Sequence, residues 1–196
     1  MTNKSMTLLV VAILYSSSLF SQTISGVVNI YVEVTAVSGA DITVASKIGF
    51  AVDDHLVIMQ MQGAEIDLTD LPLFGDVINY YSAGYYEFAK IISISGPIIT
   101  VENPLCRTYD IPSNVQLIRV AVFDNATIIG DVTATAWNGN IGGVVAIEVT
   151  NTLTFNANIN VKGQGFKGGS DCTSFFSCAV DEYYTNYTGV LSCVGQ

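Results

Sequence analysis

The chain has one histidine, His55, and it directly follows two carboxylates, Asp53 and Asp54. These residue types could ligate a metal ion or act together as an acid–base pair. Because adjacent residues of an extended segment point to opposite faces, the three side chains cannot readily converge on one ion. We therefore expect a polar turn that leads into a strand, without a catalytic or metal-binding role.

Four further carboxylates, at Glu65, Asp67, Asp70 and Asp76, lie in a segment that a proline and glycines interrupt. Hard cations such as calcium take oxygen ligands from flexible acidic loops of this kind. The spacing does not match an EF-hand, so we favour a solvated acidic loop, with calcium binding at these four residues as the alternative. No other cofactor is expected.

Trp137, which precedes Asn138, could stack on a sugar ring, but a single tryptophan beside a glycine-rich turn is more often a packing residue. The segment GQGFKGG at 163–169 follows a strand pattern without a helix pattern after it, which argues against nucleotide binding. The sequence contains neither a serine nucleophile elbow nor an HExxH motif. We predict no catalytic and no cofactor-binding residues.

The four cysteines are disulfide candidates: Cys106, Cys172, Cys178 and Cys193. They form no CxxC pair, and with a single histidine in the chain they do not match the usual spacing of zinc ligands. Disulfides are therefore favoured over metal binding, and four cysteines allow three pairings. A local bridge between Cys172 and Cys178 is the favoured one.

Composition excludes one class of partner and indicates a globular fold. The 196 residues include 17 Asp and Glu against 7 Lys and Arg, for a net charge of -10, which would repel a nucleic acid. Half of the residues are hydrophobic and 12% are charged, so the chain has ample material for a core.

The first 21 residues have the pattern of a signal peptide. Lys4 precedes the apolar run TLLVVAILY at 7–15, and serines follow it. The run is about half of the roughly 20 residues that a transmembrane helix needs. Cleavage is expected after Ser21, leaving Gln22 first, or alternatively after Ser18. We predict a secreted or cell-surface protein without a membrane span once the signal is removed.

Residues 22–120 read as an antiparallel β domain, a small barrel or a sandwich. Alternating apolar residues at 28–36 predict a half-buried strand, which can pair with 42–44 as a hairpin across a turn at 38–41. A second hairpin joins 85–94 to 98–101, and further strands are expected at 56–62 and 115–123. No stretch shows a helical period.

Residues 121–169 favour the first coils of a parallel β-helix over a continued sandwich, because strands alternate with Gly and Asn corners and lack hairpin dipeptides. In LTFNANINVK at 153–162, five alternating apolar residues should point inward: Leu153, Phe155, Ala157, Ile159 and Val161. Residues 170–196 read as a cysteine-containing tail of an incomplete domain. The predicted fold class is all-β.

Five segments resemble the N-terminal region of large secreted surface proteins of Bacteroidetes: LVIMQMQGAEID (56–67), GYYEFAKI (84–91), VQLIRV (115–120), TATAWNGNIGGVVAIEV (133–149) and GQGFKGG (163–169). The resemblance implies a region that follows the signal peptide and precedes adhesin-like repeats and a type 9 secretion sorting domain. Asp53 and Asp54 stand where the family commonly has Gly-Asp. The chain ends at Gln196 before any such repeats, so we expect a fragment of a longer product.

These observations predict a non-catalytic N-terminal module of an adhesin-like surface protein, not an enzyme. The alternative is a carbohydrate-binding or polysaccharide-cleaving β-helix protein, and a truncated product without independent function is the third possibility. The expected partners are a surface glycan, a surface protein or the continuation of the same polypeptide.

Overall fold

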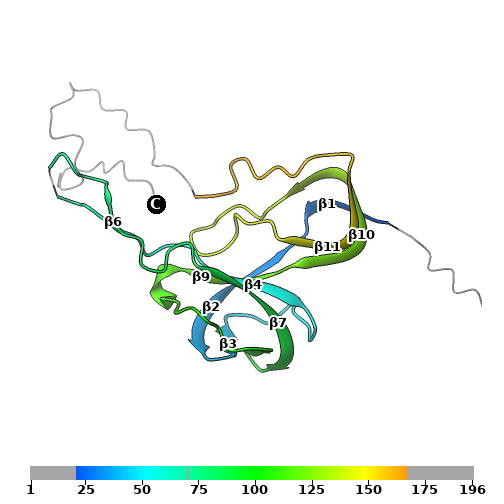
Figure 1. Cartoon of the computed structure of the whole chain (residues 1–196), viewed down its shortest axis with the longest axis horizontal. Coiled ribbons are helices and arrows are strands. Elements are labelled where there is room, and N and C mark those ends of the chain that lie inside the picture. Colours follow the sequence, from blue (N-terminus) through cyan, green and yellow to red (C-terminus); the bar gives the residue numbers. More distant parts are fainter. Residues whose placement is uncertain (1–20, 70, 167–196) are drawn as a thin grey trace, which may run out of the picture.

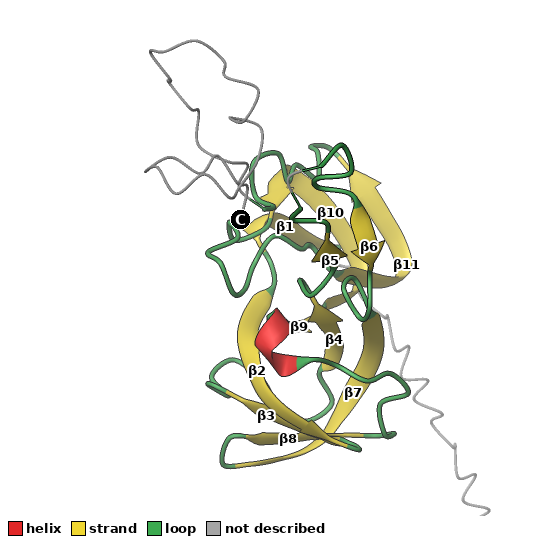
Figure 2. Ribbon diagram, turned by 90° about the vertical axis from the view of Figure 1, so that its left-hand side faces the viewer, coloured by secondary structure: helices red, strands yellow, loops and turns green. Residues whose placement is uncertain are grey.

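A computed structural model describes residues 21–69 and 71–166 as an all-β molecule with a six-stranded barrel beside a parallel sheet (Figures 1 and 2). Within these residues, no helical segment reaches the length and apolar character that crossing a bilayer requires. The predictions for the signal peptide at 1–20, for Asp70, for Cys172, Cys178 and Cys193 and for the tail at 170–196 lie outside the described residues.

The barrel closes in the order β2-β3-β8-β7-β4-β9, and every neighbouring pair is antiparallel. Its strands are β2 (Ile30–Ser38), β3 (Asp41–Val44), β4 (His55–Gln60), β7 (Tyr86–Ser95), β8 (Ile98–Val101) and β9 (Val115–Arg119). The 3-10 helix η1 (Ile111–Ser113) precedes β9. The predicted barrel and both predicted hairpins, β2-β3 and β7-β8, are confirmed.

Alternation along the strands fills the barrel. On β2, Val32 and Val34 are buried, while Glu33 and Thr35, which follow them, are exposed. Other strands add side chains that solvent does not reach, namely Ile42, Leu56, Ile58, Ile91, Ile99, Val101, Val115 and Leu117. Closure of the barrel leaves no free strand edge, and the inward side chains of all six strands pack in one small core.

The second part is a parallel sheet in the order β1-β10-β11, built from β1 (Gln22–Val27), β10 (Ala121–Thr133) and β11 (Ile147–Phe155). Ala126 of β10 pairs with Leu153 of β11, so the two strands are related by a step of 27 residues. Parallel pairing supports the β-helix-like interpretation over a continued sandwich. The strand β1 also belongs to this sheet, although the sequence analysis placed residues 22–120 together in the antiparallel domain.

The inward side of the parallel sheet has a smaller core, formed by Ile24, Ala126, Ile128 and Val132. In β11 and the segment after it, Leu153 and Ala157 pack against this core as predicted. The exposure of three other side chains contradicts the prediction that they are buried, since Phe155, Ile159 and Val161 are exposed. Phe155 ends β11, the outer strand of the described sheet, and Ile159 and Val161 follow it, where the described chain places no further strand over them.

Two barrel strands are buried on both faces, which explains their continuous apolar sequences. Leu56 and Ile58 of β4 point into the barrel, whereas Val57 points outward and packs with Ile118 and Val120. The segment that leads into β11 covers this outer cluster with Val144 and Ala146. The barrel and the parallel sheet are therefore joined by a shared apolar layer.

Buried polar side chains fix the covering segment to the barrel. Asn29 donates from Nδ2 to the carbonyls of Arg119 and Ala146 and accepts from the N–H of Ala146, at 2.6–3.0 Å. Gln116 bonds both backbone groups of Gly142 in the same way, at 2.8 and 3.1 Å. These amides replace the backbone partners that a sheet would supply, so the polar groups are satisfied without another strand.

Residues 63–85 contain a short two-stranded ribbon, β5 (Glu65–Ile66) and β6 (Val77–Asn79), where the sequence indicated a long connection. Figure 1 shows this ribbon projecting from the barrel at the end marked β6. The turn of the ribbon carries the hydrogen bonds of Phe74 N–H to the Leu71 carbonyl and of Asp76 N–H to the Leu73 carbonyl.

Candidate functional site

The outer face of β7 presents exposed aromatic rings. Alternation sends Ala89 and Ile91 toward the barrel core and leaves Tyr86, Phe88 and Lys90 outside. The ring of Phe88 is 72% exposed, and the ring of Tyr86 meets it edge to face at a centroid distance of 6.0 Å. Two exposed rings in contact on a strand of a closed barrel form an apolar surface open to water, so this face is a candidate binding surface.

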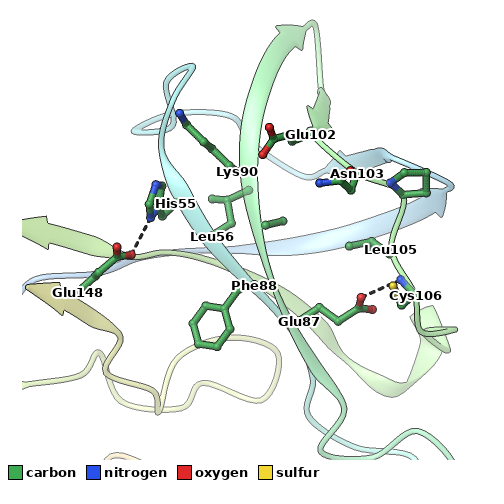
Figure 3. Close-up of a pocket in the computed structure, with 12 residues that line it drawn as sticks. His55, Leu56, Glu87, Phe88, Lys90, Glu102, Asn103, Leu105, Cys106 and Glu148 are labelled. Atoms are coloured by element: carbon green, nitrogen blue, oxygen red, sulfur yellow. Dashed lines mark hydrogen bonds and ion pairs between the residues drawn. The ribbon is translucent and has the colours of Figure 1, made fainter. Parts of the chain in front are cut away.

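A groove of about 450 Å³ adjoins Phe88 (Figure 3). Strands β4 and β7 form its floor, the loop at 102–106 forms one wall, and β11 contributes Glu148. Its hydrogen-bonding side chains include His55, Lys90, Glu102, Asn103 and Glu148. The combination of an apolar ring with several polar groups is typical of ligand sites.

His55 and Glu148 form a hydrogen bond across the two parts of the fold. His55 Nδ1 lies 2.6 Å from Glu148 Oε2, and both side chains are partly exposed (Figure 3). The histidine begins β4 of the barrel, and the glutamate lies on β11 of the parallel sheet. Because the carboxylate accepts the Nδ1 proton, it orients the imidazole ring, with Nε2 as the second nitrogen.

The polar turn predicted at 53–55 is present, and its three side chains do not converge. Asp53 has a positive φ of 74° and its carboxylate lies 2.9 Å from Lys90 Nζ, while Asp54 caps the N–H of Ala51. The hydrogen bond with Lys90 lowers the pKa of Asp53 and, reciprocally, raises that of Lys90. His55 turns away toward Glu148, so no single ion could contact all three.

Glu87 anchors the loop that walls the groove. Its carboxylate accepts the backbone N–H groups of Cys106 and Arg107, at 2.7 and 2.8 Å, and the hydroxyl of Tyr109 at 3.0 Å. Burial, together with this carboxylate, raises the pKa of the Tyr109 hydroxyl. The three bonds hold the wall in place before any ligand arrives. Above the loop, Arg107 stacks on the ring of Tyr85 at 4.5 Å.

The acidic residues considered for calcium have local partners. Glu65 accepts the hydroxyl of Tyr81, and Asp67 accepts both the N–H and the hydroxyl of Thr69. Asp70 lies outside the described residues. In residues 21–69 and 71–166, no three His, Cys, Asp or Glu side chains are grouped as a metal site would require, and calcium binding at these residues stays an untested prediction.

Trp137 is a packing residue, as the sequence indicated. Its side chain is 5% exposed, and its ring meets that of Phe166 at 5.0 Å. Among the disulfide candidates, Cys106 is an exposed free thiol at the edge of the groove.

The sequence analysis did not identify the groove residues other than His55 and Cys106. One signal for Phe88 was present: in YYEFAK the outward positions of the strand are aromatic or charged, whereas the inward ones lead into Ile91. No local signal joins His55 to Glu148, because they are 93 residues apart and belong to different sheets.

No model of a known family matches the chain, and no curated protein does. The resemblance to Bacteroidetes surface proteins therefore stays a prediction. Three solved phage tailspikes are similar in structure: Gp54 of the Acinetobacter baumannii bacteriophage AP22 in complex with A. baumannii capsular saccharide, gp61 of Pseudomonas phage phi297 and gp49 of Pseudomonas phage LKA1.

These matches are distant and partial. In the same order, the identities are 17%, 19% and 16%, the TM-scores are 0.36, 0.33 and 0.31, and the matches cover 68%, 54% and 74% of this chain. They cover only 26%, 18% and 24% of the tailspikes. The prediction that the chain is not an enzyme is corrected by these matches, because the matched solved structures are phage tailspikes.

Proposed function

We propose that this chain binds saccharides through the outer face of β7 and the adjoining groove. The observation that carries the proposal is the pair of bare rings, Tyr86 and Phe88, on a rigid barrel strand beside a set of hydrogen-bonding side chains. We place this binding surface in an extracellular protein, in keeping with the predicted signal peptide.

The chemistry of the surface suits a sugar ring. A pyranose has a face of C–H groups that can lie on the negative face of an aromatic ring, and hydroxyls around its rim that need hydrogen-bond partners. Phe88 offers the ring, Glu102 and Glu148 offer acceptor oxygens, and the Asn103 amide offers both donors and an acceptor. The aromatic ring can therefore contact the C–H face of the sugar, and the polar side chains can hydrogen-bond its hydroxyls.

The site is also held in shape before binding. Glu87 fixes the end of the loop at 102–106 through its hydrogen bonds with Cys106, Arg107 and Tyr109, and β4 and β7 are part of a closed barrel. Rigid walls reduce the ordering cost that a ligand must overcome. The tailspike solved with a capsular saccharide has a ligand of the proposed class, but the proposal rests on the surface of this chain.

An array of immobilised polysaccharides tests the proposal, with the wild-type chain and the variants Phe88→Ala and Phe155→Ala. Phe155 is the matched control, because it is an exposed phenyl ring on the parallel sheet. The wild type and Phe155→Ala should bind the same polysaccharide, and Phe88→Ala should bind about tenfold more weakly. Equal binding by all three proteins, or no binding by the wild type, would contradict the proposal.

Cleavage of the bound polysaccharide is a second candidate, favoured by the hydrogen bond between His55 and Glu148. A histidine oriented by a carboxylate through Nδ1 is the arrangement of a general base, with Nε2 available to take a proton. The pair lines the same groove as Phe88, where the sugar would lie.

Release of new chain ends from the polysaccharide identified on the array tests this activity. Wild-type protein should release ends over time, and His55→Gln should bind the polysaccharide but release none above background. If the wild type binds the polysaccharide but releases no chain ends, the chain binds this polysaccharide without cleaving it, and the second candidate is excluded.

A further inference from the structure

The projecting ribbon carries a second exposed surface, separate from the groove. Large aliphatic side chains on it are open to solvent, among them Ile66, Leu71, Leu73, Val77 and Ile78. We call these five side chains the arm surface, which includes both faces of the ribbon because Val77 and Ile78 are neighbours on β6. The most exposed are Leu73 at 60% and Ile78 at 61%.

A ribbon of this size gains little stability by itself. Two-stranded sheets are marginal in water, and β5 and β6 are two and three residues long. Soluble proteins rarely leave clustered aliphatic side chains bare, and larger patches mark interaction sites. Exposed aliphatic residues also occur elsewhere, such as Ile48 and Ile129, but the ribbon gathers several of them within residues 66–78, which points to a binding role.

Charge defines what the arm surface can bind. The sequence has no Lys, Arg or His between residues 56 and 89, whereas Glu65, Asp67 and Asp76 alternate with the aliphatic residues of the ribbon. We propose that the arm surface docks a protein partner whose own surface combines apolar side chains with Lys or Arg. The apolar groups provide the contact area, and the basic groups pair with the carboxylates.

Two other occupants fit this charge pattern less well. A second copy of the chain carries the same net charge of -10, so approach of two copies is opposed by repulsion. Insertion into a lipid bilayer would take Glu65 and Asp76 out of water together with their aliphatic neighbours, and hydrocarbon offers these carboxylates no partner. A basic protein surface removes the aliphatic groups from water and keeps the carboxylates paired.

Two labelled synthetic peptides of equal length test the proposal, one alternating Leu with Lys and the other alternating Leu with Glu. Fluorescence anisotropy is measured with the full chain as wild type, as the double variant Leu73→Ser/Ile78→Ser, and as the control Ile129→Ser. Ile129 is an exposed isoleucine on β10, and all three substituted side chains are exposed, so the fold should tolerate the changes. Vesicles of phosphatidylcholine and sedimentation of the protein alone complete the set.

The wild type and Ile129→Ser should bind the Leu-Lys peptide more tightly than the Leu-Glu peptide, and added salt should weaken the binding. The double variant should bind the Leu-Lys peptide about tenfold more weakly. Equal binding of the two peptides, equal binding by the double variant, arm-dependent binding to vesicles or arm-dependent dimerisation would each overturn the proposal. Saccharide binding by the double variant should match the wild type, so the two proposals fail separately.

Discussion

Two neighbouring stretches of the barrel wall differ in what covers them. The outer faces of β4 and β9 carry aliphatic residues, Val57 and Ile118, and the segment at 142–148 lies over them. The outer face of β7, paired to the same β4, carries Tyr86 and Phe88 and is bare. The covered face is aliphatic and therefore structural, whereas the bare face is aromatic with charged neighbours, as expected of a surface selected for a ligand.

The largest expected effect comes from opening the covered face. Ile118→Ala removes a fully buried side chain between the barrel and its cover, and should lower the free energy of unfolding by about 3 kcal/mol through lost burial and a cavity. Phe88→Ala, the matched truncation on the bare face, should change it by less than about 1 kcal/mol. Chemical denaturation measures both, and comparable losses would abolish the distinction between the two faces.

The second-largest loss of stability is expected when the hydrogen bonds that hold the segment at 142–148 on the barrel are removed. Asn29→Ala leaves the N–H and the carbonyl of Ala146 without their side-chain partner at a partly buried site, which should cost about 2 kcal/mol. Asn156→Ala, an exposed position directly after β11, is the control and should be close to neutral. Denaturation midpoints decide this, and an unperturbed Asn29→Ala protein would show that the cover is held by apolar contact alone.

A pair of glycines in the turn before the cover isolates a steric effect. Gly139 and Gly142 have nearly the same φ, 111° and 110°, but a Cβ at Gly142 would lie 2.7 Å from the carbonyl oxygen of Thr135 and one at Gly139 would meet nothing within 4 Å. Gly142→Ala should therefore destabilise the protein more than Gly139→Ala, by about 1 kcal/mol or more. Equal thermal shifts would mean that the turn relaxes freely.

The smallest effect is expected at the exposed ion pair on the bare side. Because Lys90 lowers the pKa of Asp53, the pair contributes above the ordinary pKa of an aspartate and loses its contribution as pH falls through the lowered value. An NMR titration should show Asp53 titrating below an ordinary aspartate, and Lys90→Gln should return it to the ordinary range. Lys162→Gln is the control. A large change in stability with Lys90→Gln would contradict the weak role of exposed pairs.

Alternation predicted the strands well where one face is buried. The pattern in β2 and the turn between β7 and β8 predict both hairpins, because each depends on neighbours in sequence. The pairing of β1 with β10 joins residues about a hundred positions apart, and the β1 sequence, QTISGV, contains no local pattern that predicts this partner. The exposure of Phe155 was missed for a related reason, since alternation gives the face of a strand but not whether another strand covers it.

The groove could be predicted only in part. His55 was noticed because it is the single histidine, and its separation from Asp53 and Asp54 followed from strand geometry. Its actual partner, Glu148, reaches it only because the parallel sheet docks on the barrel. Pairings of that kind depend on tertiary packing, which a local pattern does not contain.

We propose that a saccharide binds at the bare face of β7. Hydrogen exchange of the wild-type chain, with and without the oligosaccharide that its array identifies, tests this most directly. Bound saccharide should slow exchange at residues 86–92 and 102–106 and leave β1, β10 and most of β11 unchanged. Slowed exchange in the parallel sheet, with β7 unaffected at saturating ligand, would contradict it.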